Sequence, residues 1–309
     1  MTIAILGAGA FGTSLAVALG RERPVILWGR SGAGARLPGV ILPQNVTVVA
    51  DIADLASAQT VLLAVPAQAL SAILHEHGGW LDGRALVACC KGVDLTSGLG
   101  PTGLIVRACP AAMPAILTGP SFAADIARGL PTALTLACAD NATGALLQQQ
   151  LSTAVLRLYR TTDVTGAELG GALKNVVAIA AGVVIGAGLG DSARAALMTR
   201  GYAEMVRLAQ ALGAHTKTLA GLSGFGDLVL TCTSDQSRNF RYGRALGAGQ
   251  AFDTGATVEG VATAMAVTAL ARRHEIDMPV AAMVAALTLG QITLPQAIQA
   301  LLSRPLKQE

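Results

Sequence analysis

Apolar residues form a series of short, almost unbroken runs in the first half of the chain. Each run is followed by turn residues and then by residues with helical spacing. Continuous apolar strands that alternate with helices are typical of a parallel sheet covered by helices on both faces. The pattern predicts strands at residues 3–6, 25–28, 46–49, 61–65, 85–89, 115–117, 133–137 and 155–158.

Beyond about residue 160 the apolar positions recur with helical spacing instead, and several residues suit helix ends. Ser192 can begin a helix that Gly213 ends, and Pro279 suits a first helical turn. Thr293 and Gln296 have the spacing of a capping box. Helices are therefore expected at about 165–187, 192–212, 257–273, 279–289 and 294–303. The chain divides into an α/β domain over residues 1–160 and an all-helical domain over residues 161–309.

The composition describes a folded chain with tightly packed helices. Hydrophobic residues make up 52% of the 309 positions and charged residues only 13%, which excludes a disordered chain. Glycine occurs 36 times while aromatic residues reach only 3%, so Ala/Gly-rich helices are expected to approach one another closely. The net charge of +3 is spread along the chain without a basic, aromatic-rich run, which argues against nucleic acid as a partner.

Cysteine and histidine spacing gives no sign of a metal or a disulfide framework. The five cysteines are odd in number and lack a C-x-x-C pair, which favours reduced thiols in a cytoplasmic protein. His75 and His77 flank Glu76 without further ligands nearby, so a polar loop is expected there and no metal.

Neither a targeting segment nor a membrane span is expected. The N-terminus lacks a basic region and a cleavage site, and it has the pattern of a strand. The apolar run at residues 176–189 is interrupted by glycines and is shorter than the roughly 18 residues that a spanning helix needs. A buried or interface helix is expected at this run.

A glycine-rich turn directly follows the first strand. Residues 7–12 read Gly-Ala-Gly-Ala-Phe-Gly and open a helix, which is the context that a dinucleotide-binding fingerprint requires. Gly7 permits the tight turn, Gly9 lets the backbone approach a pyrophosphate, and Gly12 lets the helix lie against the strand. The helix N-terminus offers free N–H groups to the phosphates. The sequence therefore predicts an N-terminal Rossmann-type doubly wound sheet.

The end of the second strand bears on the choice of cofactor. An acidic residue there would bind the ribose 2′-hydroxyl of NAD(H), but the strand ends with Trp28, Gly29 and Arg30. Arg30 can meet a 2′-phosphate, so NADP(H) is the preferred cofactor and NAD(H) remains possible. The alternative is that Arg30 stacks on the adenine and both cofactors are used.

One charged side chain lies within a long apolar segment. Residues 170–190 read GGALKNVVAIAAGVVIGAGLG, in which Lys174 is the only charge and Asn175 its polar neighbour. The periodicity alone favours a lysine with a buried stem and a head in water. Three further islands contain chemistry-bearing residues: 90–92 (CKG), 118–123 (TGPSFA) and 221–239, where Asp227 and Thr231 share a face if the segment is helical.

Taken together, these islands resemble bacterial NAD(P)-dependent glycerol-3-phosphate dehydrogenase over nearly the whole chain. The resemblance rests on GAGAFGTSLA (7–16), LPGVILP (37–43), AVP (64–66), KG (91–92), GPSFA (119–123), GGALKNVVAIAAG (170–182), ARAALMTRG (193–201), GFGDLVLTC (224–232), SRN (237–239) and VEG (258–260). It implies a Rossmann domain with a helical substrate domain, a homodimer, and interconversion of sn-glycerol 3-phosphate and dihydroxyacetone phosphate for phospholipid synthesis.

The resemblance also implies a role for each matching residue. Lys174 matches the catalytic proton acceptor of the family. Positions that match substrate contacts are Lys91, Gly119, Ser121, Asp227, Ser237, Arg238 and Asn239. Positions that match cofactor contacts, beside Gly7, Gly9 and Gly12, are Ala10, Phe11, Arg30, Lys91, Ala123, Arg238 and Glu259.

A proton-transfer role would explain the isolated lysine. A secondary alcohol releases hydride only as a base takes its hydroxyl proton, and a lysine with a lowered pKa can exchange that proton. Burial and Lys91 should lower the pKa of Lys174, while Asp227 should raise it. We expect Asp227 and Asn175 to orient Lys174. Arg238, with Asn239 and Lys91, should hold the substrate phosphate.

Several alternatives stand beside these roles. Arg238 fits a surface arginine, Asp227 a helix cap, Glu259 a first-turn glutamate, and Ser121 the N-cap of the following helix. Cys232 is expected in the core. For the whole chain, the alternatives are a ketopantoate or β-hydroxyacid dehydrogenase and a cofactor-sensing module without turnover.

Three positions depart from the family pattern. Asp191 stands where asparagine is usual, Ala10 replaces a frequent serine, and residues 31–39 are short enough to lack a helix.

Overall fold

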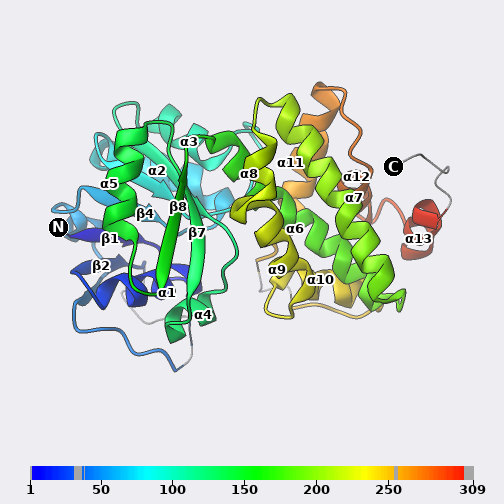
Figure 1. Ribbon diagram of the computed structural model, residues 1–309, viewed down its shortest axis with the longest axis horizontal. Coiled ribbons are helices and arrows are strands. Elements are labelled where there is room, and N and C mark those ends of the chain that lie inside the picture. Colours follow the sequence, from blue (N-terminus) through cyan, green and yellow to red (C-terminus); the bar gives the residue numbers. More distant parts are fainter. Residues whose placement is uncertain (1, 31–36, 38, 254–256, 303–309) are drawn as a thin grey trace.

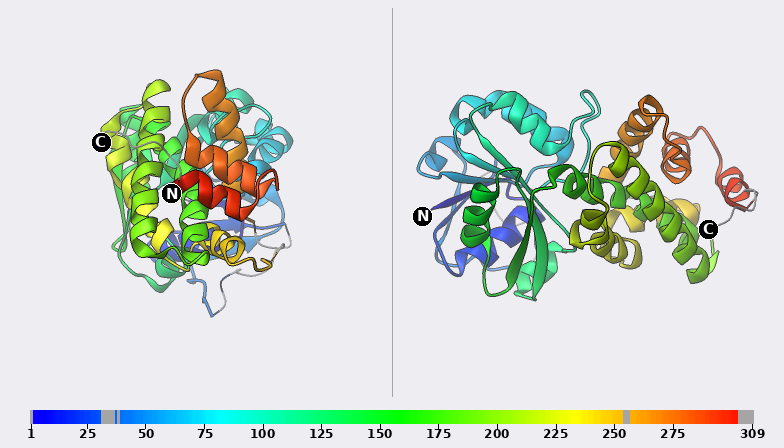
Figure 2. Two further views of the ribbon diagram at one scale, coloured as in Figure 1. Left: turned by 90° about the vertical axis from the view of Figure 1, so that its right-hand side faces the viewer. Right: turned by 45° about the horizontal axis from the view of Figure 1, so that its top comes forward.

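The computed structural model places a sheet with its covering helices beside a cluster of helices (Figure 1). The structure describes residues 2–30, 37, 39–253 and 257–302. Figure 2 shows the same two halves from other directions, with β8 leading directly into the helical half.

Every predicted strand is present. The strands are β1 (Ile3–Leu6), β2 (Val25–Trp28), β3 (Val46–Val49), β4 (Thr60–Leu63), β5 (Ala85–Ala88), β6 (Met113–Thr118), β7 (Thr132–Ala137) and β8 (Leu156–Thr161). They form one sheet in the order β3-β2-β1-β4-β5-β6-β7-β8. The order reverses between β1 and β4, which is the point where such sheets bind their ligands.

The prediction of a wholly parallel sheet is wrong at one pair, because β6 and β7 are antiparallel. Their link contains only the short helix α4 (Ala123–Arg128), about 9 Å long at the usual rise. Because β7 runs opposite to β6, it starts at the edge of the sheet where β6 ends, so α4 connects two points on the same edge. The chain therefore turns at the carboxyl end of β6 and enters β7 there.

Helices cover both faces of the sheet, as the pattern predicted. Leu70, Leu104 and their neighbours from α2 (Ala67–Leu81) and α3 (Pro101–Ala108) fill one face. Leu15 and Leu147, from α1 (Ala10–Gly20) and α5 (Asn141–Leu151), fill the other. A 3₁₀ turn, Ile52–Leu55, precedes β4.

The segment of residues 75–77 is helical, so the expected polar loop is wrong. The segment lies inside α2, where His77 Nε2 is 3.6 Å from Glu76 Oε1. A helix is favoured because Leu70, Leu74 and Leu81 line a buried stripe at helical spacing.

The helical half contains the five long helices that were predicted and further short ones. Its elements are α6 (Val164–Gly186), α7 (Gly190–Ala211), α8 (Thr216–Ala220), a π turn (Leu222–Gly226), α9 (Asp227–Thr233), α10 (Arg238–Gly247), α11 (Glu259–Arg273), α12 (Pro279–Thr288) and α13 (Leu294–Leu302). The helices between residues 216 and 247 were not predicted.

The predicted helix ends are correct except at Ser192. Gly213 ends α7 with a φ of +82°, and Pro279 occupies the first turn of α12. Thr293 and Gln296 form the capping box, with Gln296 Oε1 accepting from Thr293 N at 2.8 Å. Ser192 lies inside the first turn of α7, because the left-handed backbone at Gly190 starts the helix two residues earlier.

Helix α6 runs through the centre of the helical half. Within the described residues it is the one helix long and apolar enough to cross a membrane, yet 89% of its apolar window is buried inside the protein. The expectation of a buried helix is thus confirmed. Glycines let α10 cross it closely, since a Cβ on Gly182 would meet the carbonyl of Phe240. The expected close packing of glycine-rich helices is confirmed as well.

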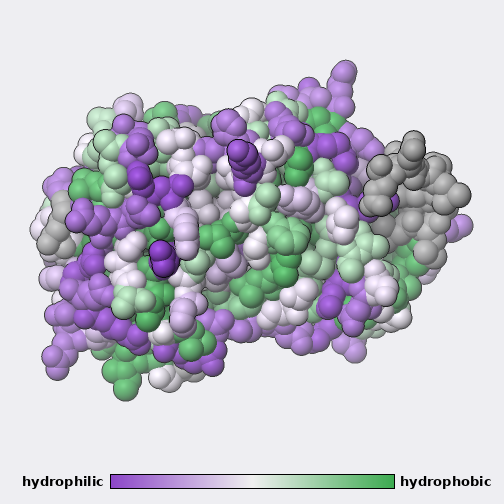
Figure 3. Space-filling view, in the orientation of Figure 1, coloured by the Kyte–Doolittle hydropathy of each residue, from purple (hydrophilic) through white to green (hydrophobic). Residues whose placement is uncertain are grey.

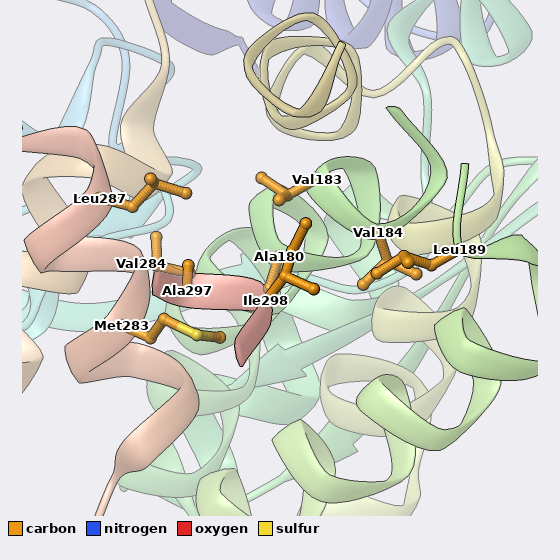
Figure 4. A pocket seen from close by; sticks show the side chains of 9 residues that line it. All are labelled: Ala180, Val183, Val184, Leu189, Met283, Val284, Leu287, Ala297 and Ile298. Atoms are coloured by element: carbon orange, nitrogen blue, oxygen red, sulfur yellow. The ribbon is translucent and has the colours of Figure 1, made fainter. Parts of the chain in front are cut away.

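An apolar cavity lies along the second half of α6, between α6, α12 and α13 (Figure 4). It is small, with about 20 Å³ available to a water-sized molecule, and it is partly open to solvent. Its lining is Ala180, Val183, Val184, Leu189, Met283, Val284, Leu287, Ala297 and Ile298. None of these side chains can donate or accept a proton, so the chemistry must lie elsewhere.

Hydrophobic groups are also visible on the face over α8 and α9, where the two halves meet (Figure 3). In the π turn and α9, Phe225 and Val229 have 50% and 37% of their surface exposed. The ring of Phe225 meets that of Tyr202 edge-on, with centroids 5.6 Å apart.

Candidate active site

The glycine turn at the end of β1 has the shape that a phosphate requires. Gly7 has a φ of +116°, and a Cβ there would clash with the carbonyl of Ala64. A Cβ on Gly12 would clash with the carbonyl of Gly7. By contrast, no atom lies within 4 Å of a Cβ on Gly9, the N-cap of α1. The space beside Gly9 at the N-terminus of α1 is thus open, as the close approach of a pyrophosphate requires.

Three further predicted cofactor residues surround this turn. Ala10 and Phe11 begin α1, and Phe11 packs partly into the core on that face of the sheet. Arg30 follows β2 at the carboxyl edge and is exposed, and its side chain has no ion pair within the described residues. Most of the short segment after Arg30 lies outside the described residues, namely 31–36 and 38.

Lys174 lies in the middle of α6 and points at a carboxylate. Its Nζ is 2.8 Å from Asp227 Oδ1 and 2.6 Å from Thr231 Oγ1. The residue is only 7% exposed. The interpretation as a lysine with its head in water is therefore wrong, because α9 supplies two oxygen acceptors inside the protein.

Asp227 is shared between two lysines. Its Oδ2 accepts a hydrogen bond from Lys91 Nζ at 2.6 Å, and the same Nζ donates to the carbonyl of Gly119 at 3.0 Å. The side chain of Asp227 is fully buried. Asp227 is the first residue of α9, but its carboxylate binds lysines and not the helix N-terminus, so the alternative as a helix cap is wrong.

This setting brings the pKa of Lys174 toward neutrality. Burial lowers the pKa from its ordinary 10.5 to about 8, and Lys91 acts in the same direction. The attraction and hydrogen bond of Asp227 oppose the shift. The directions of these three effects on the pKa of Lys174 agree with the expectation from the sequence, and burial is the largest of them.

Two asparagines connect three helices beside the lysine. Asn239 Nδ2 donates to Asn175 Oδ1 at 2.9 Å, and Asn239 Oδ1 accepts from the backbone N–H of Gly260 at 3.0 Å. The pair links α6, α10 and α11. Asn175 is next to Lys174 in the chain but forms no hydrogen bond with it among the described residues.

Ser237 and Arg238 start α10 near this pair. Ser237 is the N-cap, and its Oγ accepts from Phe240 N at 3.2 Å. Arg238 is exposed and has no ion pair in the part of the chain that the structure describes. It lowers the pKa of Glu259, the first residue of α11, whereas burial raises that pKa and prevails. Glu259 is thus both a first-turn glutamate and a neighbour of Arg238.

The turn after β6 forms the part of the site next to Lys91. Gly119 has a φ of +131°, and its carbonyl accepts from Lys91 and from Ser121 Oγ, the latter at 3.3 Å. The N-cap of α4 is Phe122, so the alternative of Ser121 as that cap is wrong. Ala123 is the first residue of α4.

Thr231 is the residue of this cluster to which the sequence assigned no role. Its four-residue spacing from Asp227 could have indicated such a role. In helix α9 this spacing places both side chains on one face, where both contact Lys174. Cys232 is fully buried, as expected. Asp191 is 81% exposed at its side chain and pairs with Arg194 at 3.0 Å, so it does not enter the lysine cluster.

Comparison with known families accounts for almost the whole chain. Residues 2–144 match the family described as NAD-dependent glycerol-3-phosphate dehydrogenase N-terminus, and residues 163–299 match the corresponding C-terminus. This chain belongs to the NAD-dependent glycerol-3-phosphate dehydrogenase family. The resemblance found from the sequence is therefore confirmed.

Individual proteins of the glycerol-3-phosphate dehydrogenase family support the same assignment. A protein of Cereibacter sphaeroides named glycerol-3-phosphate dehydrogenase [NAD(P)+] is 74% identical over 99% of this chain and its own full length. A protein of the same name from Paracoccus denitrificans is 63% identical over both full lengths. The crystal structure of glycerol-3-phosphate dehydrogenase from Coxiella burnetii has a TM-score of 0.92 at 35% identity, covering 98% of this chain and 99% of that one.

More distant structures share the fold alone. A ketopantoate reductase family structure from Ralstonia eutropha has a TM-score of 0.63 at 15% identity, covering 96% of this chain and 100% of that one. The predicted fold class, a Rossmann-type sheet with a helical C-terminal half, is confirmed. The boundary at residue 160 stays a prediction.

Proposed function

We propose that this chain interconverts sn-glycerol 3-phosphate and dihydroxyacetone phosphate, using NADP(H) in preference to NAD(H). The observation that carries the proposal is the buried Lys174 hydrogen-bonded to Asp227, on the carboxyl side of a sheet whose first turn suits a pyrophosphate. The nicotinamide, when bound, accepts or supplies the hydride at C2. The residues of the chain manage the proton and hold the substrate.

Lys174 exchanges the proton on the C2 oxygen. In oxidation its neutral amine takes the hydroxyl proton, and in reduction its ammonium returns one to the carbonyl oxygen. Asp227 and Thr231 hold the Nζ in place, and Asp227 also stabilises the ammonium. Asn175 follows Lys174 in the chain, and its Oδ1 accepts a hydrogen bond from Asn239. Its amide nitrogen therefore remains available to donate a hydrogen bond beside Lys174.

The substrate phosphate binds where cationic and N–H donors converge. Arg238 at the start of α10 offers a planar set of donors, and Lys91 supplies a second cation. Asn239 is held between α6 and α11, which fixes the position of the α10 N-terminus. Ser237, Gly119 and Ser121 form the polar surface around this phosphate.

Oxidation of NADPH with dihydroxyacetone phosphate as the only added substrate tests the activity. Turnover that requires both compounds is expected. Turnover with ketopantoate or a β-hydroxyacid instead would favour another member of the fold group. Cofactor binding without turnover of any of these substrates would favour a cofactor-sensing module.

The value of kcat should depend on pH with opposite signs for oxidation and for reduction. Because the pKa of Lys174 is about 8, the amine is mostly charged below that pH and mostly neutral above it. We expect kcat for oxidation to rise with pH through about 8 and kcat for reduction to fall through the same range. Steady-state kcat measured in both directions across this range checks the prediction, and parallel slopes would contradict it.

Arg30 should determine the cofactor preference. Replacing Arg30 with alanine is expected to lower kcat/KM for NADPH by about tenfold or more while NADH changes little, because only NADPH carries a 2′-phosphate. The measurement is kcat/KM for both cofactors, with the exposed Arg272→Ala as the control. Equal losses for both cofactors would indicate stacking on adenine instead.

The cellular setting follows from the same reaction. We propose that the product, glycerol 3-phosphate, supplies phospholipid synthesis, that the protein works as a homodimer, and that it is cytoplasmic. All five cysteines are free and buried, which fits a reducing compartment. Sedimentation of the purified protein at micromolar concentration tests the dimer.

A further inference from the structure

Glu168 of α6 reaches from the helical half to the N-terminus of α3 in the sheet half. Its Oε1 accepts a hydrogen bond from the backbone N–H of Thr102 at 2.7 Å. The N-cap residue of α3 is Gly100, which has no side chain to cap the helix itself. A carboxylate at this place satisfies a free N–H and interacts favourably with the helix dipole. The cap of α3 is therefore supplied by the other half of the protein.

Gly100 leaves room for this carboxylate. A Cβ on Gly100 would lie 3.1 Å from Glu168 Oε1 and closer still to Oε2. The backbone of Gly100 has a φ of −73° and a ψ of 170°, which any residue adopts. A side chain at this position would thus displace the Glu168 carboxylate, although the backbone conformation itself does not demand glycine.

Glu168 begins a row of residues on α6 that faces the sheet half. Glu168 and Gly171, three residues apart, lie on the side of α6 that meets the sheet half, whereas Lys174 further along the helix reaches Asp227 and Thr231 of α9. A Cβ on Gly171 would lie 2.5 Å from Thr118 Oγ1 and 3.5 Å from Lys91 Cγ. The stem of Lys91 therefore passes over the bare backbone of α6 on its way to Asp227.

The same row is closely fitted to the sheet half at its centre. Thr118 Oγ1 is buried against it and has no hydrogen-bond partner in the described part of the chain. Burial raises the pKa of the Glu168 carboxyl, and the hydrogen bonds from Thr102 oppose that shift. A partly dehydrated carboxylate that bridges two halves is placed to determine how they meet.

We propose that Glu168 is a positioning residue for the reaction: by capping α3 it holds α6 in register against the sheet half, and so holds Lys174 opposite the nicotinamide site. This inference rests on the proposed function. Glu168 lies about 9 Å from Lys174 along α6, so it acts through the helix and does not touch the reacting atoms.

Glu204 provides a matched control. It is a buried glutamate on α7 that also caps a helix, with its Oε1 accepting from Val280 N at 2.8 Å at the start of α12. Both of these helices belong to the helical half. Removing either carboxylate uncaps one helix, but only the loss of Glu168 loosens the contact between the two halves.

The test compares kcat at saturating substrate and cofactor with the melting temperature. Both Glu168→Ala and Glu204→Ala should lower the melting temperature, Glu204→Ala at least as much as Glu168→Ala, because Glu204 accepts from both Val280 N and Ala281 N. Only Glu168→Ala should lower kcat, by about tenfold to a hundredfold, because misplacing a catalytic group by an ångström is costly. Glu168→Gln should restore most of kcat, since its amide oxygen still accepts from Thr102 N.

A second pair of variants tests the same contact from α3, should Glu168→Ala fold poorly. Gly100→Ala pushes the carboxylate away and should lower kcat, whereas Gly103→Ala on the same helix makes only ordinary contacts, 3.4 Å from Leu99 Cβ, and should not. Equal kcat in Glu168→Ala and Glu204→Ala, or full kcat in Gly100→Ala, would overturn the inference. An inactive wild-type protein would instead refute the proposed function, and this inference with it.

Discussion

Replacing Lys174 with methionine is expected to lower kcat for reduction of dihydroxyacetone phosphate on the order of 10³-fold, because it removes the proposed donor of the proton to the C2 oxygen. Methionine fills similar space among the apolar neighbours of Lys174. Asp227 stays paired with Lys91 at 2.6 Å, so the buried carboxylate keeps a cation and the fold should persist.

The Lys174 prediction has two internal controls. Affinity for NADPH, measured by fluorescence quenching, should stay near the wild-type value, since the glycine turn lies on β1 and α1. Lys217→Met changes an exposed lysine on α8 and should leave kcat unaltered. Turnover of Lys174→Met near that of wild type would refute the assignment of the proton to Lys174.

Replacing Gly243 with alanine is expected to have the largest effect on stability. A Cβ on Gly243 would be forced into the backbone carbonyl of Ile179 on α6, at far less than 3.0 Å. Gly247 meets Val183 in the same way, and on α6 Gly182 and Gly186 meet the backbone of α10. Glycines four residues apart on both helices thus let the two backbones approach each other closely at this crossing.

We expect Gly243→Ala to cost about 3 kcal/mol of unfolding free energy, which corresponds to a melting temperature lower by on the order of 10 °C. Thermal unfolding followed by circular dichroism measures this. Gly79→Ala is the matched control: Gly79 is exposed in α2 with no atom within 4 Å of its added Cβ. That variant should melt at the wild-type temperature or above, because alanine favours the helix. A similar melting temperature for both variants would show that the α6–α10 crossing accommodates an added methyl group at little cost in stability.

The α6–α10 crossing also connects stability to the site. α10 begins with Arg238 and Asn239, and Asn239 is hydrogen-bonded to Asn175 on α6. Because the two helix backbones approach each other closely at the glycines, the proposed phosphate-binding arginine is held close to the helix that carries Lys174. A substitution that pushes the helices apart should therefore weaken substrate binding as well as the fold.

The sequence by itself determined the features that short windows encode. Apolar runs located the eight strands, and they are continuous in the inner strands because a strand buried on both faces must be apolar throughout, whereas the edge strand β8 alternates buried and exposed residues. The turn at residues 7–12 was predictable because glycine requirements are local. Lys174 was noticeable because a charge is costly in an apolar helix, and its companions came from the resemblance.

The tertiary structure alone decided how distant residues meet. Asp227 is 136 residues from Lys91 and 53 from Lys174, and no local pattern shows that one carboxylate serves both. The apolar run of β7 carried no signal for its antiparallel direction beside β6, and the start of α7 depended on glycines that precede Ser192. Glu168 carried no signal as a cap for α3, because its partner lies 66 residues earlier in the chain. Periodicity reports which face of an element is buried, whereas the partner on that face is chosen by packing across the whole molecule.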